Sequence, residues 1–151
     1  MVEGVRIRSY EHADEDQVVA LWQACELTRP WNDPRRDIAR KLDTQAGPFL
    51  VAEAEGSLVG TAMVGYDGHL FWINYLAVHP ARRTQGIGRA LMARAERELT
   101  SLGCPKLNLQ VRSSNGQVLA FYARLGYLQD DVVSLGKRLI HDNNTTPPET
   151  A

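Results

Sequence analysis

The sequence predicts a single mixed α/β domain with the element order βααβββαβαβ. Segments whose apolar residues recur at helical spacing alternate with short runs that are typical of strands. Tight turns at Glu55-Gly56 and Asp67-Gly68 separate the three middle runs and favour neighbouring antiparallel strands. At 151 residues the chain can bury a core of its own, and we expect the domain to span residues 1–141. Residues 142–151 lack the apolar residues that a core needs, so we expect a disordered tail there.

The first third of the chain predicts one strand and two helices. Residues 5–10 alternate between apolar and polar side chains, which indicates a short strand. Residues 13–27 indicate a helix, because four apolar residues share one face at i, i+3, i+4 and i+7, namely Val18, Leu21, Trp22 and Cys25. Pro34 favours the first turn of a second helix, with Asn32 or Asp33 as its cap.

The middle of the chain predicts three strands and a long helix. The strands are expected over 49–53, 58–66 and 70–78, and the last is apolar on both faces, as central strands of a sheet are. Residues 86–102 show the clearest helical pattern, with one apolar stripe. Three further elements complete the order: a strand over 106–111, a helix from 115 to 125 and a strand over 132–139.

Composition narrows the classes of function. Lys and Arg number 17, Asp and Glu number 18, and the net charge is −1. Proteins that bind nucleic acid through its phosphates normally carry a basic excess, so we expect no nucleic-acid partner. No stretch reaches the roughly 18 apolar residues of a transmembrane helix, and residues 1–6 lack the apolar core of a signal peptide. We therefore expect a soluble, cytoplasmic protein without a membrane partner.

The cysteines and histidines predict no metal site. Cys25 and Cys104 lie far apart without C-x-x-C spacing, so we expect two reduced thiols. The histidines show neither an i, i+4 pair nor an H-E-x-x-H motif; they are His12, His69, His79 and His141.

The most informative segment is the run Arg83-Thr84-Gln85-Gly86-Ile87-Gly88-Arg89, which follows a predicted strand and opens a predicted helix. The first N–H groups of a helix have no intrahelical partner and lie at the positive end of the helix dipole, so they attract anions. Glycines at 86 and 88 let the backbone approach a phosphate closely. The run matches neither a Walker A loop nor a dinucleotide fingerprint. We therefore expect a different phosphorylated ligand at this turn.

This run resembles the loop that binds the pyrophosphate of coenzyme A in the GNAT superfamily of acyl-CoA-dependent N-acetyltransferases. Residues 76–80 resemble the end of that family's fourth strand, and residues 111–115 with 120–127 resemble its second signature. The resemblance covers residues 4–140. The segments Arg29-Pro30-Trp31-Asn32-Asp33-Pro34 and Gly65-Tyr66-Asp67-Gly68-His69 further resemble a small bacterial branch of the family.

The resemblance implies a fold, a co-substrate and a reaction. The fold would be a central, mostly antiparallel sheet flanked by about four helices. The reaction would move an acetyl group from acetyl-CoA to a primary amine by direct attack in a ternary complex, without a metal or a covalent nucleophile. The residues that would bind acetyl-CoA are Leu76, Ala77, Val78, Arg83, Thr84, Gln85, Gly86, Ile87, Gly88, Arg89 and Asn115. Thr84 replaces a glycine that is frequent in relatives, and a positive φ there would cost about 1 kcal/mol.

Tyr122 is the candidate general acid, because it matches the tyrosine of the second signature. A phenol has a pKa of about 10 and a thiol a pKa of about 8.5, so the phenol stays protonated at neutral pH and can donate to a departing thiolate. The alternative is a core role, since Tyr122 shares helical spacing with Phe121 and Leu125.

The sequence leaves the general base open. Relatives that acetylate protein N-termini often carry Glu where this chain has Gln110, and an amide cannot take a proton. Asp67 and His69 are tentative bases or acceptor-binding groups, although Asp67-Gly68 is also ordinary turn chemistry. Asp33 is a further candidate that also fits a helix cap, and a water relay is equally compatible.

The acceptor is expected to lie against Trp31, Asn32 and Asp33, with a preference for cationic amines because carboxylates lie nearby. Gln110 in place of Glu makes us favour a small amine or an amino acid over a protein N-terminus or a lysine. The alternative class is a non-catalytic acyl-CoA-binding regulatory module, against which Tyr122 argues. The resemblance leaves open whether the protein is a homodimer.

Overall fold

The computed structural model describes residues 2–44, 47–67 and 70–142. The main elements are β1 (Val5–Ser9), α1 (Glu15–Ala24), α2 (Pro34–Thr44), β2 (Phe49–Ala54), β3 (Ser57–Tyr66), β4 (Phe71–Val78), α3 (Ile87–Ser101), β5 (Leu107–Leu109) and α4 (Gly116–Arg124). Two 3-10 turns, η1 (His12–Asp14) and η2 (Pro80–Arg82), precede α1 and follow β4.

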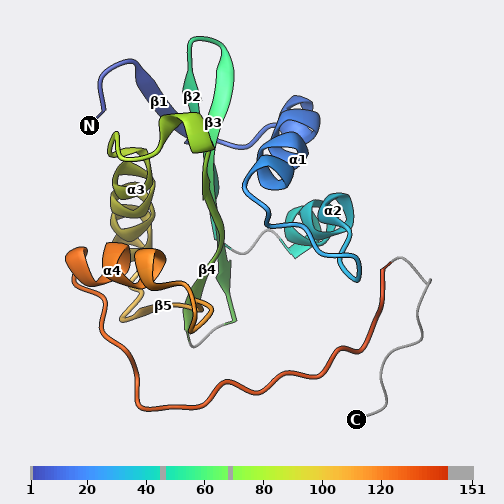
Figure 1. Cartoon of the computed structure of the whole chain (residues 1–151), viewed down its shortest axis with the longest axis vertical. Helices are drawn as coiled ribbons and strands as arrows, with labels where there is room; N and C mark the ends of the chain where they lie inside the picture. The colour runs from blue at the N-terminus through green and yellow to red at the C-terminus, as the bar shows by residue number, and fades with distance from the viewer. Residues whose placement is uncertain (1, 45–46, 68–69, 143–151) are drawn as a thin grey trace.

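The five strands form one sheet in the order β1-β2-β3-β4-β5. The first four pair antiparallel, and β5 pairs parallel to β4. Figure 1 shows α1 and α2 on one face of the sheet and α3 and α4 on the other. The predicted fold class, a mixed α/β domain with a mostly antiparallel sheet and four helices, is therefore confirmed.

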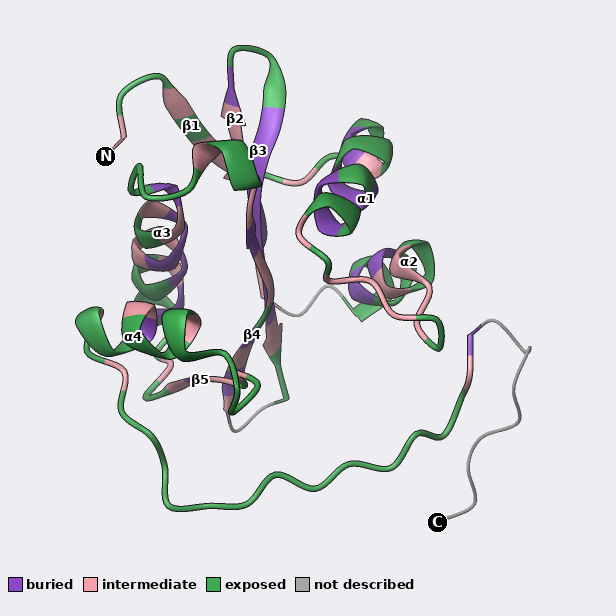
Figure 2. Ribbon diagram, viewed as in Figure 1, coloured by how far each residue is buried: buried purple, intermediate pink, exposed green. Residues whose placement is uncertain are grey.

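Each face of the sheet has its own hydrophobic cluster, because successive side chains of a strand point to opposite faces. In β2, Leu50 and Ala52 join the cluster beneath α3, whereas Val51 joins the cluster beneath α1 and α2. Figure 2 shows the resulting burial along the central strands and the inward faces of α1 and α3. Helix α3 lies very close to β3 at Gly60, where an added Cβ would be 2.9 Å from the Leu91 Cδ1 atom.

A buried polar chain links α1 to β4 through the sheet. The Trp22 Nε1 atom donates to the Thr61 hydroxyl at 2.9 Å, and that hydroxyl donates to the Tyr75 carbonyl at 2.8 Å. The Trp22 and Tyr75 rings also stack, with centroids 3.8 Å apart. These contacts fix the backbone and the ring of Tyr75 from the core side.

The strand expected over 132–139 is not formed, so the observed order ends at α4. Residues 125–142 contain no strand and run as an extended segment from α4 towards α2 (Figure 1). Alternating apolar residues predicted the strand, but a strand also needs a partner backbone. The segment meets the region of β5 through two side-chain contacts, Lys106 with Asp130 and Gln110 with Ser134. Its apolar side chains stay exposed, as Leu135 at 91% shows.

The expected boundary of the tail falls on a residue that the structure packs in place. The Asp142 carboxylate is buried, pairs with Arg40 at 2.6 Å and accepts the Asp33 N–H at 2.7 Å. The remaining residues of the predicted tail, 143–151, lie outside the described residues. In the described part of the chain, no helix combines the length and apolar character that a membrane span requires.

Candidate functional site

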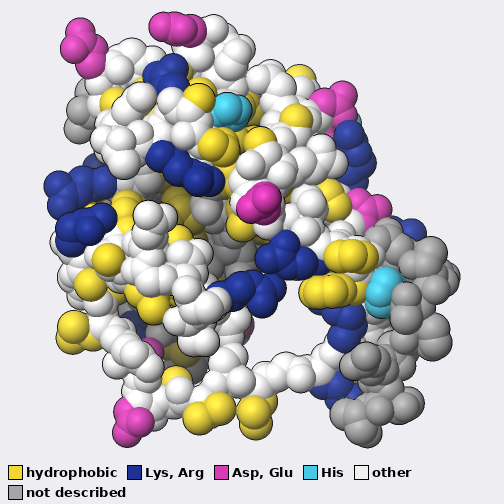
Figure 3. All heavy atoms as spheres, in the orientation of Figure 1, with side chains coloured by type: hydrophobic (Ala, Val, Ile, Leu, Met, Phe, Trp, Pro, Cys, Tyr) yellow, Lys and Arg dark blue, Asp and Glu magenta, His cyan; other side chains and the backbone are white. Residues whose placement is uncertain are grey.

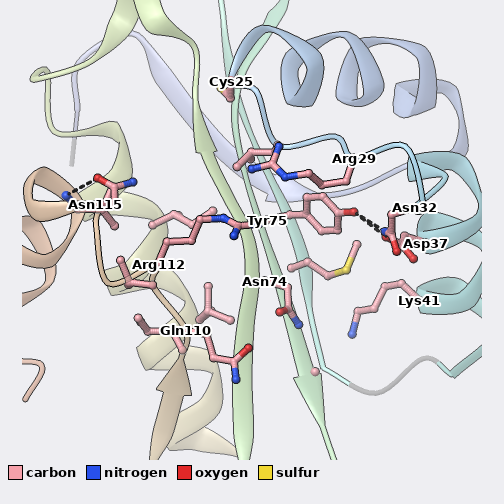
Figure 4. Close-up of a pocket in the computed structure, with 18 of the residues that line it drawn as sticks. Cys25, Arg29, Asn32, Asp37, Lys41, Asn74, Tyr75, Gln110, Arg112 and Asn115 are labelled. Atoms are coloured by element: carbon pink, nitrogen blue, oxygen red, sulfur yellow. Dashed lines mark hydrogen bonds between the residues drawn. The ribbon is translucent and has the colours of Figure 1, made fainter. Parts of the chain in front are cut away.

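A cavity of about 1150 Å³ lies beside β4, between two walls that come from different parts of the chain. Strand β5 pairs with β4 only up to the Ile73–Leu109 pair, after which β4 continues to Val78. One wall comes from the end of α1, the loop after it and α2, and the other from β5 and α4, with β4 between them (Figure 4). Figure 3 shows this hollow from outside, with Lys and Arg side chains at its edge.

Strand β4 is irregular where it lines the cavity. Thr61 pairs with Ala77 and Met63 pairs with Asn74, so two residues of β4, Tyr75 and Leu76, oppose one residue of β3. This is a β-bulge, and Tyr75 adopts a left-handed φ of 50° within it. Such a conformation costs a non-glycine residue about 1–2 kcal/mol, and strain of this kind is concentrated at functional sites.

The bulge places the Tyr75 hydroxyl against a carboxylate on α2. The hydroxyl donates to the Asp37 Oδ2 atom at 2.5 Å, and the Asn32 amide donates to the same carboxylate oxygen (Figure 4). Arg40 donates to the other oxygen at 3.0 Å. Burial and the neighbouring Asp37 carboxylate raise the pKa of Tyr75, so its phenol stays a hydrogen-bond donor.

Tyr122 lines the cavity from α4. Its side chain is 7% exposed, and its ring packs edge-to-face against Phe121 and Tyr127. Burial raises the pKa of the Tyr122 phenol to about 12. None of the described residues forms a hydrogen bond with its hydroxyl. The residue therefore packs in the core and also presents an unused donor to the cavity.

The predicted phosphate loop joins the end of β4 to α3. Gly86 is the N-cap of α3 and has a left-handed φ of 87°. Because glycine has no side chain, no cap hydrogen bond occupies the first N–H groups of the helix. Thr84 also has a positive φ, 63°, and its hydroxyl donates to the Arg83 carbonyl at 2.6 Å. Helix α3 is 15 residues long, and its start, with a glycine as N-cap and no side-chain cap, fits a phosphorylated ligand.

Three residues that were predicted to serve the co-substrate or the chemistry line the cavity itself: Leu76, Asn115 and Tyr122. The Asn115 side chain caps α4 by accepting from the Val118 N–H at 3.3 Å. The run 83–89 does not line the cavity but follows β4 directly through η2. The end of β4 therefore connects the cavity to the loop.

Of the predicted acceptor-binding residues, the structure brings Asn32 into the cavity. Trp31 is 39% exposed and uses its carbonyl to hold the Asp142 N–H. Asp33 lines a smaller neighbouring hollow, and its carboxylate accepts the Arg35 N–H at 2.9 Å in the first turn of α2.

The turn that carries the two tentative bases lies elsewhere. Asp67 follows β3, and its carboxylate accepts the Leu70 N–H at 2.7 Å, as a turn residue does. It is not among the residues that line the cavity. His69 lies outside the described residues.

Sequence reasoning assigned no role to several charged or polar groups that line the cavity, among them Glu26, Arg29, Asp37, Arg40, Lys41, Tyr75 and Arg112. One signal was present, because Asn74-Tyr75 interrupts a strand that is otherwise apolar on both faces. Lys41 is buried, its ammonium donates to the Val64 carbonyl, and burial lowers its pKa. Within the described ranges, no three His, Cys, Asp or Glu side chains are grouped so that they could hold a metal ion.

Comparison with known proteins relates this geometry to one family. Residues 16–127 match the model of the acetyltransferase (GNAT) family. Acetyltransferase SG1711 of Sodalis glossinidius (strain morsitans) is 50% identical over 139 residues, which are 91% of this chain and 98% of that protein.

Solved structures share the fold. The structure of yncA from Salmonella typhimurium, with its cofactor acetyl-CoA, is 26% identical with a TM-score of 0.68, covering 81% of this chain and 78% of its own. A protein from Agrobacterium tumefaciens is 21% identical with a TM-score of 0.76, covering 88% of this chain and 99% of its own, and it shows a likeness of fold.

Proposed function

We propose, from the premise that this chain belongs to the acetyltransferase (GNAT) family, that it acetylates the primary amine of a small molecule by direct attack in a ternary complex. The predictions of the family, of an acetyltransferase and of acetyl-CoA as co-substrate are confirmed. The acceptor and the roles of individual residues are the proposal. One observation carries it: the cavity has an unused phenol, Tyr122, on one wall and a carboxylate, Asp37, on the other.

The co-substrate fits the start of α3 and the end of β4. The uncapped N–H groups after Gly86 would hold the pyrophosphate, with Arg83 and Arg89 as flanking cations. Leu76 and Asn115, which line the cavity, would border the remainder of acetyl-CoA, together with Ala77 and Val78 at the end of β4. When bound, acetyl-CoA supplies the acetyl group as a thioester.

Tyr122 would hold a proton for the departing sulfur. The same burial that raises its pKa to about 12 also disfavours a thiolate in the cavity, so a nearby O–H donor stabilises the leaving group. The absence of a hydrogen-bond partner among the described residues supports this role, because the hydroxyl has no competing contact.

Asp37 would take up the proton that the acceptor ammonium must lose. It is a carboxylate within the cavity, whereas the described carboxylates of Asp33 and Asp67 bond to backbone N–H groups nearby in the chain. The hydrogen bonds that it accepts from Tyr75, Asn32 and Arg40 fix its orientation. Transfer would run directly or through one water.

A thiol-release assay with acetyl-CoA tests the proposal over small amines, amino acids and peptides. We expect release that depends on the amine and favours small acceptors. Asp37→Asn should lower kcat/KM by about 10²-fold or more, which is the lower range for general acid–base catalysis. Asp67→Asn is the matched control and should retain wild-type kcat/KM. Equal activity of both variants would remove Asp37 from the mechanism, and preferential acetylation of peptides would refute the small acceptor.

A further inference from the structure

The cavity carries more positive than negative charge. Its basic lining residues are Arg29, Arg40, Lys41 and Arg112, and its acidic lining residues are Glu26 and Asp37. Arg40 is neutralised by Asp142 at 2.6 Å and by Asp37 at 3.0 Å. Apart from these pairs and from Lys41, which donates to the Val64 carbonyl, the lining leaves two arginines, Arg29 and Arg112, and one acid, Glu26.

Arg29 is held in the loop between α1 and α2 with its charge uncompensated. Its Nη1 atom donates to the Glu26 carbonyl at 2.9 Å and to the Thr28 carbonyl at 3.0 Å, so the backbone fixes the guanidinium. These contacts leave Nε and Nη2 available. No carboxylate in the described part of the chain forms an ion pair with it.

Arg112 stands on the opposite wall, after β5. It too has no ion pair or side-chain hydrogen bond with any residue that the structure describes. Figure 4 shows the Arg29 and Arg112 side chains reaching from opposite walls towards the space beside Tyr75. Two like charges that face one space repel each other, and an anion between them would be attracted to both. A planar guanidinium binds a carboxylate or phosphate through two N–H groups at once.

We propose that the acceptor amine also carries an oxyanion group, a carboxylate or a phosphate, which Arg29 and Arg112 bind. This inference rests on the proposed function, because it describes the acceptor of the same cavity. It replaces the preference for purely cationic amines that the sequence suggested. The acceptor would then be a zwitterion, with its amino end towards the carboxylate of Asp37.

The competing explanation is that these arginines hold phosphates of acetyl-CoA. The start of α3 has its own cations for that purpose, Arg83 and Arg89, and the run 83–89 lies outside the cavity lining. The affinity for acetyl-CoA separates the two explanations.

The test compares acceptors that differ in one charge: an amino acid and its amide, and an aminoalkyl phosphate and the matching alkylamine. Thiol release gives kcat/KM for each, and calorimetry gives the acceptor's Kd in the presence of coenzyme A. In at least one pair, we expect kcat/KM for the member with the anionic group to be more than tenfold higher than for the member without it. The difference should arise mainly from a lower KM. The pair that shows the difference identifies carboxylate or phosphate.

Arg29→Gln and Arg112→Gln should each abolish that difference and leave the Kd for acetyl-CoA within about twofold. Arg124→Gln, an exposed arginine at the end of α4 and outside the cavity, is the control and should retain the difference. Equal kcat/KM within both pairs would overturn the inference. It would also be overturned if Arg29→Gln or Arg112→Gln weakened the binding of acetyl-CoA and left the difference between the acceptors unchanged. If no amine is acetylated, the proposed function fails, and the calorimetric comparison within each pair still decides the inference.

Discussion

Replacing Tyr122 by Phe removes one hydroxyl from a well-packed ring and separates the catalytic from the packing role. The side chain is 7% exposed and packs edge-to-face against two aromatic rings, which phenylalanine preserves. Since no described residue forms a hydrogen bond with the hydroxyl, its loss leaves no donor or acceptor among them unsatisfied. The free energy of unfolding should therefore change by less than about 1 kcal/mol.

The effect on the rate should be much larger. A general acid contributes about 10²- to 10⁴-fold, which corresponds to about 2.7–5.4 kcal/mol of transition-state stabilisation. Burial raises the pKa of Tyr122 to about 12, and a raised pKa keeps the group protonated below that value. The phenol should thus remain a donor throughout the assay range, and the wild-type kcat should show no loss from its ionisation between pH 7 and about pH 10.

Three measurements check this reasoning on the same protein preparation. Thermal unfolding should show a shift in Tm below about 4 °C, as expected for 1 kcal/mol in a domain of this size. Calorimetry should show an unchanged Kd for acetyl-CoA, and thiol release should show the fall in kcat. If Tyr122→Phe keeps the wild-type kcat with a good acceptor, the residue is a core residue and the thiolate leaves unassisted. A large loss of Tm would assign the hydroxyl a structural role.

Three further predictions concern the loop, the core and the C-terminal segment. Gly86→Val forces a β-branched residue to a φ of 87° and should weaken the binding of acetyl-CoA more than tenfold, as measured by calorimetry. The far-UV circular dichroism spectrum should not change. An unchanged affinity would refute the loop assignment. Gly60→Ala places a Cβ 2.9 Å from a core methyl and should cost about 1–3 kcal/mol in urea unfolding, whereas Gly65→Ala in the same strand, with open space, is the control. The Arg40 guanidinium lowers the pKa of Asp142 to about 2, so this carboxylate stabilises the fold above about pH 4 and loses the effect as the pH falls towards 2. Asp142→Asn should therefore cost about 1 kcal/mol at pH 7, a value reduced because Arg40 is half exposed, and much less at pH 2; a pH-independent difference would contradict the linkage.

The elements that the sequence predicted well depend on local patterns. Helix α3 and strands β2, β3 and β4 were expected within a few residues of their observed bounds, because apolar spacing and turn glycines act within one segment. The resemblance raised the case of a positive φ at Thr84, where relatives often carry glycine, and the structure has a φ of 63° there. The family and the co-substrate also followed from these short motifs.

The last predicted strand shows the limit of such patterns. Residues 132–139 alternate as a strand does, but whether alternation becomes a strand depends on a backbone partner elsewhere in the molecule. The structure gives that segment side-chain contacts near β5 and ends it at the Arg40 guanidinium instead.

The sequence by itself determined the fold class and the kind of enzyme, because the patterns and motifs that indicate them lie within short segments of the chain. Only the tertiary structure decided which polar side chains meet in the cavity. Asp37 and Tyr75 are 38 residues apart, and they meet because a bulge in β4 turns the tyrosine towards α2. Arg29 and Arg112 face one space because the loop after α1 and the segment after β5 lie on opposite walls of the cavity. No local pattern specifies such pairs, because packing across the sheet sets which distant side chains share a cavity.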